Sequence, residues 1–177
     1  MILKENFAIY LILFDLESRW DSAKKRINNY ITKSKALASD VVLITNKQLN
    51  ESMDIRYFLP ERNVNNAHFL QEILVDSQKV YTIIFDVKYS LYFDILVSTF
   101  IQTIRDYNAV VLRSNQGKLI PQVAIYNKSN ILYIFDSNLK HVGKKIDDLL
   151  GIIPNVLVIN EFALNNIVKK FSRRKEK

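Results

Sequence analysis

The chain has 177 residues, 49% of them hydrophobic, which is enough for one sizeable core and too little for two comfortable domains. It has no cysteine, which excludes disulfides, thiolate nucleophiles and zinc–thiolate sites, and its isolated histidines, His68 and His141, do not suggest a histidine metal cluster. The longest apolar run, residues 7–14, is too short to span a membrane, and the first residues lack a signal pattern. We therefore expect a soluble, cytoplasmic protein with no membrane partner, and any bound metal should have oxygen ligands.

The net charge of +7 is concentrated near the C-terminus rather than spread over a basic face. Residues 169–177 contain six Lys and Arg and one acid, Glu176, and so carry +5 of that charge, which leaves +2 for the rest of the chain. We interpret residues 172–177 as a solvated basic tail that follows a single α/β domain of residues 1–171. A phosphate-rich partner for the tail is the alternative, so nucleic acid is not the favoured partner.

Two periodicities alternate along the chain and predict strands and helices. Apolar runs predict strands at residues 7–14, 40–46, 54–59, 80–85, 109–112, 121–126 and 156–159. Three- and four-residue spacings predict helices at residues 20–38, after Asn65 and Asn66, at residues 90–105, from Ser129 to residue 135, at residues 144–150 and around Leu164. The aromatic residues of the third helix are interpreted as core rather than as a base-stacking platform: Tyr89, Tyr92, Phe93 and Phe100.

Strands separated by helical segments predict an α/β fold of three layers, αβα, in which helices cover both faces of a mostly parallel, twisted sheet. In such sheets, ligands bind beyond the carboxyl ends of the strands, where the winding reverses. Asp15, Asn46 and Asp86 all follow or end predicted strands. If those strands are neighbours, the three side chains converge on one crevice.

The stretch from Leu13 to Lys25, LFDLESRWDSAKK, carries a resemblance to a known family. It aligns without a gap to the loop L-A-G-G-x-S-R-R-M-G-x-D-K of the nucleotidyltransferase family that includes the MobA-like molybdenum cofactor guanylyltransferases, which have the nucleotide-diphospho-sugar transferase fold. The matching residues are Leu13, Ser18, Arg19 and Lys25. Asp15, Leu16 and Ser22 stand in place of the three glycines.

Later segments extend the resemblance in chain order. Residues 80–86 resemble the family strand whose last aspartate, here Asp86, holds magnesium. Residues 119–126, LIPQVAIY, are similar to the family's P-Q-P-L-x-A-x-Y segment and include Gln122. Asn160 belongs to an I-N pair that matches the family's last strand.

The resemblance implies transfer of GMP from GTP to a molybdopterin-type or other phosphorylated acceptor, with Mg²⁺ as cofactor and a nucleotide and a phosphorylated small molecule as partners. It implies nucleotide or phosphate contacts from Leu13, Ser18, Arg19, Lys25 and Asn46. Gln122 and Asn160 are then expected at the acceptor or sheet-end site. Asp86 is the implied metal ligand.

Loss of the glycines changes what this loop can do. Glycine accepts positive φ and lets backbone N–H groups approach a phosphate, whereas Leu16 has neither property. The Asp15 carboxylate, if uncompensated about 4 Å from a phosphate oxygen, opposes binding by roughly 4 kcal/mol at an effective dielectric constant of about 20. Asp15 is therefore predicted either to share a divalent cation with Asp86 or to act as an ordinary helix N-cap or solvated carboxylate.

Two classes of function follow from this erosion. The first is a nucleotidyltransferase that works with an eroded phosphate loop. The second is a catalytically inactive descendant that serves as a nucleotide-binding, ligand-binding or protein-interaction module. Retained backbone access to phosphates favours the first, and a loop filled by Asp15, Leu16 and Trp20 favours the second.

Overall fold

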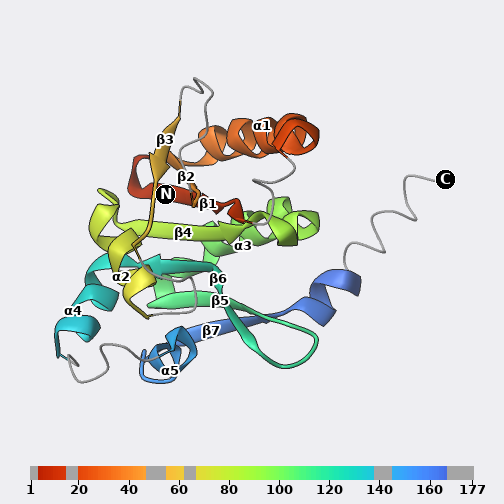
Figure 1. Ribbon diagram of the computed structural model, residues 1–177. Coiled ribbons are helices and arrows are strands. Elements are labelled where there is room, and N and C mark those ends of the chain that lie inside the picture. Colours follow the sequence, from red (N-terminus) through yellow and green to blue (C-terminus); the bar gives the residue numbers. More distant parts are fainter. Residues whose placement is uncertain (1–3, 15–19, 47–54, 62–66, 138–144, 167–177) are drawn as a thin grey trace.

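A seven-stranded mixed sheet organises the protein (Figure 1). The structure, a computed structural model, describes residues 4–14, 20–46, 55–61, 67–137 and 145–166. The strands are β1 (Phe7–Ile12), β2 (Asp40–Ile44), β3 (Arg56–Phe58), β4 (Tyr81–Asp86), β5 (Ala109–Arg113), β6 (Leu119–Asn127) and β7 (Val156–Asn160). Their order is β3-β2-β1-β4-β6-β5-β7, which Figure 1 shows from top to bottom. Only β6 runs antiparallel to its neighbours among these strands, so the prediction of a mostly parallel sheet is confirmed.

Helices cover both faces of the sheet, which confirms the three-layer αβα prediction. The labelled α-helices are α1 (Trp20–Leu37), α2 (Ala67–Asp76), α3 (Phe93–Thr103), α4 (Lys128–Ser137) and α5 (Ile146–Leu150), and the short 3₁₀ helices are η1 (Lys4–Asn6), η3 (Val87–Tyr92) and η4 (Ile104–Asp106). Residues 161–166 are also helical, as predicted around Leu164. Side chains of α1 and α3 share one hydrophobic cluster, and those of α2, α4 and α5 share the other. Within the described residues, no helix is both long enough and apolar enough to cross a membrane.

Both faces of β1 are covered by core, which explains why its sequence is apolar throughout and does not alternate with polar residues. Phe7, Ile9 and Leu11 belong to the cluster under α1 and α3, while Ala8 and Tyr10 belong to the cluster on the opposite face. Every residue of β1 is therefore buried, as expected for a central parallel strand.

Proline interrupts the pairing of β6 without ending the strand. Leu112 of β5 pairs with Ile120, whereas Val111 pairs with Ala124, so the register shifts at the position of Pro121. The ladder between β4 and β6 begins only at Val123. Because proline has no N–H to donate, this irregularity accommodates it, and β6 starts at Leu119, earlier than expected.

Two details of the predicted helices are wrong. The predicted helix of residues 90–105 is divided into η3, α3 and η4, and Tyr89 within η3 has a non-helical conformation of φ −89°, ψ 19°. The helix expected to start at Ser129 starts at Lys128, and the side chain of Asn127 accepts a hydrogen bond from the backbone N–H of Asn130 at 3.4 Å. Asn127 therefore takes the capping role expected of Ser129.

Aromatic packing under α3 follows the core prediction. Tyr92, Phe93 and Phe100 are buried, and the Phe93 ring lies edge-on to Phe85 of β4 with ring centroids 5.0 Å apart. Tyr89 is only partly buried and lies at the end of the sheet described next. These rings stabilise the core face rather than offer a row of exposed stacking surfaces.

Candidate functional site at the carboxyl edge of the sheet

The strand order produces one reversal of winding, between β1 and β4. The chain starts at β1, moves outward through β2 to β3, and then returns to the other side of β1 with β4. In open α/β sheets, ligands bind beyond the carboxyl ends of the strands at such a point, so this reversal marks the edge where a ligand is expected. The predicted convergence requires β1, β2 and β4 to be neighbours, and this is confirmed.

Asp86 lies at this reversal. It is the last residue of β4, is 8% exposed, and is in register with Ile12, the last residue of β1. The antiparallel ladder between β4 and β6 ends at the pair Phe85 and Val123. Asp86 on β4 and Gln122 on β6 each lie one residue beyond this last pair, so both are at the same edge although they are 36 residues apart in the sequence.

Both carboxylate oxygens of Asp86 are engaged by Lys88. The backbone N–H of Lys88 donates to Oδ1 at 3.0 Å, and Nζ of Lys88 lies 2.8 Å from Oδ2. The ammonium group also lies 5.4 Å from the centroid of the Tyr89 ring, within the range of a cation–π contact. One lysine thus bonds the carboxylate through both its backbone and its side chain.

The charges at this edge act on Tyr89. Burial raises the pKa of the Tyr89 hydroxyl because it disfavours the phenolate, the nearby Lys88 ammonium lowers that pKa, and the carboxylates of Asp86 and Glu161 raise it. Tyr89 is therefore within electrostatic reach of carboxylates from the ends of two different strands, β4 and β7.

Glu161 is a residue of this edge that the sequence interpretation missed. It directly follows β7, and its Oε2 accepts a hydrogen bond from the backbone N–H of Asn115 at 2.9 Å. The Tyr92 hydroxyl lies 3.5 Å from Glu161 Oε1 and 2.6 Å from Asn165 Oδ1. Burial, followed by the charge of Glu161, raises the pKa of Tyr92. Glu161 lies two residues after the predicted strand 156–159, so a carboxylate close to the end of a predicted strand, the signal used for Asp15 and Asp86, is the signal that could have found it.

The other predicted site residues that the structure describes form no hydrogen bond or ion pair with Asp86. Leu13 is buried, and its backbone N–H donates to the carbonyl of Ile44 at 3.0 Å, so it joins β1 to β2 rather than presenting a side chain to the crevice. Asn46 is exposed just beyond β2, and Asn160 is exposed at the end of β7. Lys25 is exposed on α1. Asp15, Ser18 and Arg19 lie outside the described residues, so their predicted roles stay predictions.

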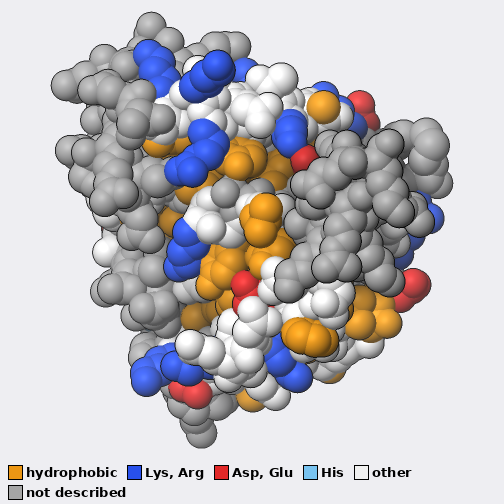
Figure 2. All heavy atoms as spheres, turned by 90° about the vertical axis from the view of Figure 1, so that its right-hand side faces the viewer, with side chains coloured by type: hydrophobic (Ala, Val, Ile, Leu, Met, Phe, Trp, Pro, Cys, Tyr) orange, Lys and Arg blue, Asp and Glu red, His pale blue; other side chains and the backbone are white. Residues whose placement is uncertain are grey.

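Figure 2 looks onto this edge, because it shows the right-hand side of Figure 1, toward which β1 and β4 point. Hydrophobic side chains gather at the centre of the face, and Lys and Arg side chains run down its left-hand side. An apolar centre with cations beside it suits a ligand that combines a flat, weakly polar group with an anionic one.

The described residues contain no cluster of metal ligands, and the implied ligand Asp86 is already paired. Among them, no group of three or more His, Cys, Asp and Glu side chains could hold a metal ion. Asp86, the implied magnesium ligand, has both oxygens engaged by Lys88. The pairing of Asp15 with Asp86 around a cation stays a prediction.

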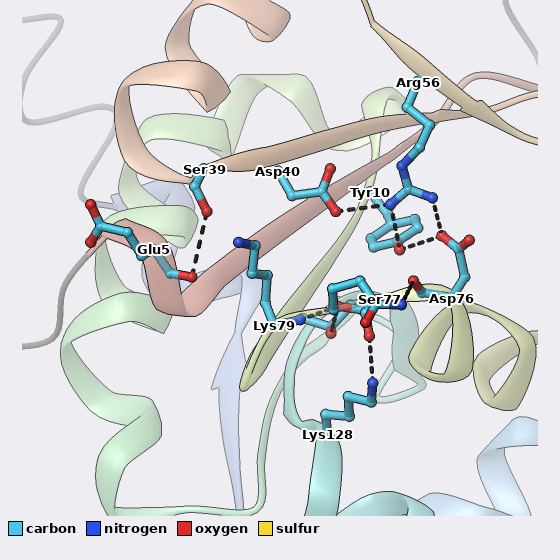
Figure 3. A network of polar contacts seen from close by, with 11 residues as sticks. Glu5, Tyr10, Ser39, Asp40, Arg56, Asp76, Ser77, Lys79 and Lys128 are labelled. Atoms are coloured by element: carbon cyan, nitrogen blue, oxygen red, sulfur yellow. Dashed lines mark hydrogen bonds and ion pairs between the residues drawn. The ribbon is translucent and has the colours of Figure 1, made fainter.

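A second polar feature lies at the opposite, amino edge of the sheet (Figure 3). Arg56, the first residue of β3, bonds Asp76 Oδ2 at 2.5 Å and Asp40 Oδ2 at 2.8 Å, and its Nη2 lies 3.3 Å from the Tyr10 hydroxyl. Burial and the hydrogen bond to Asp76 raise the pKa of Tyr10. A groove of about 650 Å³ lies beside this network, with lining residues that include Lys4, Lys35, Asp40 and Arg56.

The network at the amino edge was not predicted. Its bonded residues come from four elements and are between 16 residues apart (Asp40 and Arg56) and 66 residues apart (Tyr10 and Asp76) in the sequence. Nothing in the local pattern of β3 distinguishes Arg56 from a solvated cation. No predicted site residue lines the groove, and the network fixes β3 and α2 against β1 and β2. We therefore place the candidate site at the carboxyl edge.

Comparison with known proteins supports the fold but no sequence family. No protein-family model matches the sequence, and no curated protein matches it significantly. Solved structures do match over most of the chain. The molybdopterin-guanine dinucleotide biosynthesis protein A of Archaeoglobus fulgidus has a TM-score of 0.63 and 12% identity, with 92% of this chain and 88% of that chain covered.

Two further structures are cytidylyltransferase-type proteins. The 4-diphosphocytidyl-2C-methyl-D-erythritol synthase of Anaerococcus prevotii has a TM-score of 0.59 and 12% identity and covers 89% of this chain and 87% of its own. The 2-C-methyl-D-erythritol 4-phosphate cytidylyltransferase of Thermus thermophilus has a TM-score of 0.55 and 12% identity over 88% and 89% of the two chains. At these identities the likeness concerns architecture alone. The chain thus has an α/β fold of the nucleotide-diphospho-sugar transferase type.

Proposed function

We propose that this protein is a nucleotide-binding, nucleotidyltransferase-like protein that takes a nucleoside triphosphate into the crevice at the carboxyl edge between β1 and β4. The observation that carries the proposal is the position of Asp86, at the end of β4, in register with the end of β1 at the reversal of winding. Gln122 of β6 lies at the same edge, one residue beyond the last pair of the β4–β6 ladder. The fold neighbours support the choice of ligand, since their names describe guanine dinucleotide synthesis and cytidylyl transfer.

Within this crevice, the phosphates are assigned to the side of α1. Lys25 is exposed on that helix, and Arg19 precedes it in the sequence. Cations of this kind form charge-assisted hydrogen bonds to phosphate oxygens, and they can act where a backbone cradle has been lost with its glycines. The apolar centre of the face in Figure 2 suits the base.

Transfer of GMP to a molybdopterin-type or other phosphorylated acceptor is the catalytic form of the proposal. An acceptor phosphate oxygen would attack the α-phosphorus of GTP, the new P–O bond would form as the α–β bridge breaks, and pyrophosphate would leave. The neighbour from Archaeoglobus fulgidus favours this acceptor, and Gln122 and Asn160 are assigned to its side of the crevice. Binding without transfer is the alternative, favoured by the engagement of Asp86 by Lys88.

The experiment is a calorimetric titration with GTP, CTP, ATP and UTP, each with Mg²⁺ and with a chelator. Lys25→Met is expected to weaken the tightest of them by about tenfold, the loss of one charge-assisted contact. Lys4→Met is the matched control, because Lys4 is an exposed cation at the opposite edge. Absence of binding by all four nucleotides, or equal loss in both variants, would contradict the proposed site. Release of pyrophosphate with an added phosphorylated acceptor separates transfer from binding alone.

A further inference from the structure

A lysine holds the carboxylate that the fold would assign to a metal ion. Lys88 Nζ lies 2.8 Å from Asp86 Oδ2, and the backbone N–H of the same residue bonds Oδ1. The Asp86 side chain is 11% exposed and the Lys88 side chain 51% exposed. The carboxylate is therefore largely buried with its charge compensated by the ammonium group, while about half of the lysine side chain is exposed.

The position of the ammonium group is fixed from two further sides. Lys88 Nζ lies 5.4 Å from the centroid of the Tyr89 ring, which is itself partly buried. The backbone of Lys88 is held in η3 directly after β4, where its N–H bond to Asp86 closes an Asx-type turn. Lys88 is thus held at the reversal of winding rather than extended freely into solvent.

A divalent cation at Asp86 would have to displace this ammonium. Magnesium in nucleotide sites is usually held by one or two carboxylates together with waters and substrate phosphates, so it would need an Asp86 oxygen that Lys88 now engages. A lysine offers one positive charge and no vacant coordination position. It can nevertheless contact a carboxylate and a phosphate at the same time, since an ammonium group has three donors.

We propose that the Lys88 ammonium takes the place of a divalent cation at Asp86, so that phosphate binding in this crevice is independent of metal. The nucleotide part of this inference rests on the proposed function. The ligand class is a nucleotide or other phosphoryl compound presented as the free anion, with one phosphate oxygen on Lys88 and the remaining charge met by Lys25.

Two measurements test the substitution of lysine for metal. The first is a titration with Mn²⁺ alone, in which binding is measured by calorimetry and by the change in thermal unfolding temperature. Wild type and Asp86→Asn should respond identically, because Asp86 does not bind the ion. Saturable Mn²⁺ binding by the wild type that is lost in Asp86→Asn would overturn the proposal, whatever the nucleotide result.

The second measurement is the affinity for GTP in chelator and in Mg²⁺. Wild type should bind equally in both, Lys88→Met should bind about tenfold more weakly in chelator, and Lys118→Met, an exposed cation of the β5–β6 turn, should be unchanged. Lys88→Met leaves the Asp86 carboxylate without its partner, so its weaker GTP binding could come from a folding defect. The double variant Asp86→Asn, Lys88→Met removes both charges, and its thermal unfolding temperature shows whether the unpaired carboxylate was the cause. Binding that requires Mg²⁺ overturns this inference while the proposed function stands. Absence of GTP binding under both conditions contradicts the proposed function, and the Mn²⁺ titration then decides the inference alone.

Discussion

Arg56 Nη1 lies 2.5 Å from Asp76 Oδ2, and this ion pair joins the edge strand β3 to the end of α2 (Figure 3). The same guanidinium reaches Asp40 at 2.8 Å and lies 5.8 Å from the centroid of the Tyr10 ring. One side chain therefore connects β1, β2, β3 and α2 at the edge of the sheet opposite the candidate site.

Arg56→Met should lower the free energy of unfolding by about 1 to 2 kcal/mol, because it leaves two carboxylates without their shared cation while keeping most of the aliphatic stem. Urea unfolding measures the change. Arg105→Met, at an exposed position of η4, is the matched control and should stay within about 0.5 kcal/mol of wild type. Equal effects of the two substitutions would show that the network contributes nothing to stability.

Stability should fall in alkaline solution through Tyr10. Its pKa in the folded state is raised above the ordinary value of 10.0, chiefly by burial and then by the hydrogen bond to Asp76. Between the unfolded and the folded pKa, the unfolded chain binds fewer protons, so the free energy of unfolding decreases as pH rises above 10. Tyr10→Phe should reduce that slope. Urea denaturation at about pH 9, 10 and 11, on either side of the ordinary tyrosine pKa, measures this pH dependence. If Tyr10→Phe and wild type lose stability equally as the pH rises, Tyr10 is not the group responsible.

Ser34→Ala should stabilise the protein. Ser34 of α1 is 0% exposed, and its Oγ has no hydrogen-bond partner among the described residues. Removing an unpaired buried hydroxyl should raise the free energy of unfolding by about 1 kcal/mol, and alanine adds a few tenths through helix propensity. Thr32→Ala is the control, because Thr32 is exposed on the same helix and its hydroxyl donates to the carbonyl of Asn28. It measures the effect of alanine on helix stability without the removal of a buried hydroxyl. A loss of stability in Ser34→Ala would show that the hydroxyl has a partner in solution.

Glu161→Gln should lower the pKa values of both Tyr89 and Tyr92. The carboxylate raises both in the folded protein, although burial is the larger cause in each. Alkaline titration of the phenolate absorbance, compared with the same titration of Tyr89→Phe and Tyr92→Phe, separates the two contributions. Identical titration curves for wild type and Glu161→Gln would remove Glu161 from the candidate site.

The layers of the fold and the position of Asp86 could be predicted from the sequence. Apolar runs bounded by helical spacings fix which segments are strands, and a carboxylate that ends such a run must lie at a carboxyl edge. Periodicity does not show that β1 and β4 are neighbours, which the structure establishes. The position of Gln122 at the same edge as Asp86 depends on the antiparallel direction of β6, which no local pattern in residues 119–127 reveals.

Lys88 shows why the rest could not be predicted. In the sequence it is a cation between two aromatic segments, and its role depends on the turn that η3 makes directly after β4. Arg56 is similar, because its partners Tyr10, Asp40 and Asp76 meet only after three crossovers have formed. Charge compensation between distant segments follows from topology, and periodicity carries no information about it.

The placement of β6 has a consequence for how the protein opens. β5 and β7 join the sheet only through β6, so the ladder between β4 and β6 is a seam that separates the first four strands from the last three. Local unfolding along that seam would release β5, β6 and β7 as one cooperative unit. Asp86 and Gln122 each lie one residue beyond the last pair of this ladder, so a ligand held by both would slow amide hydrogen exchange in β5, β6 and β7, including in strands that it never touches.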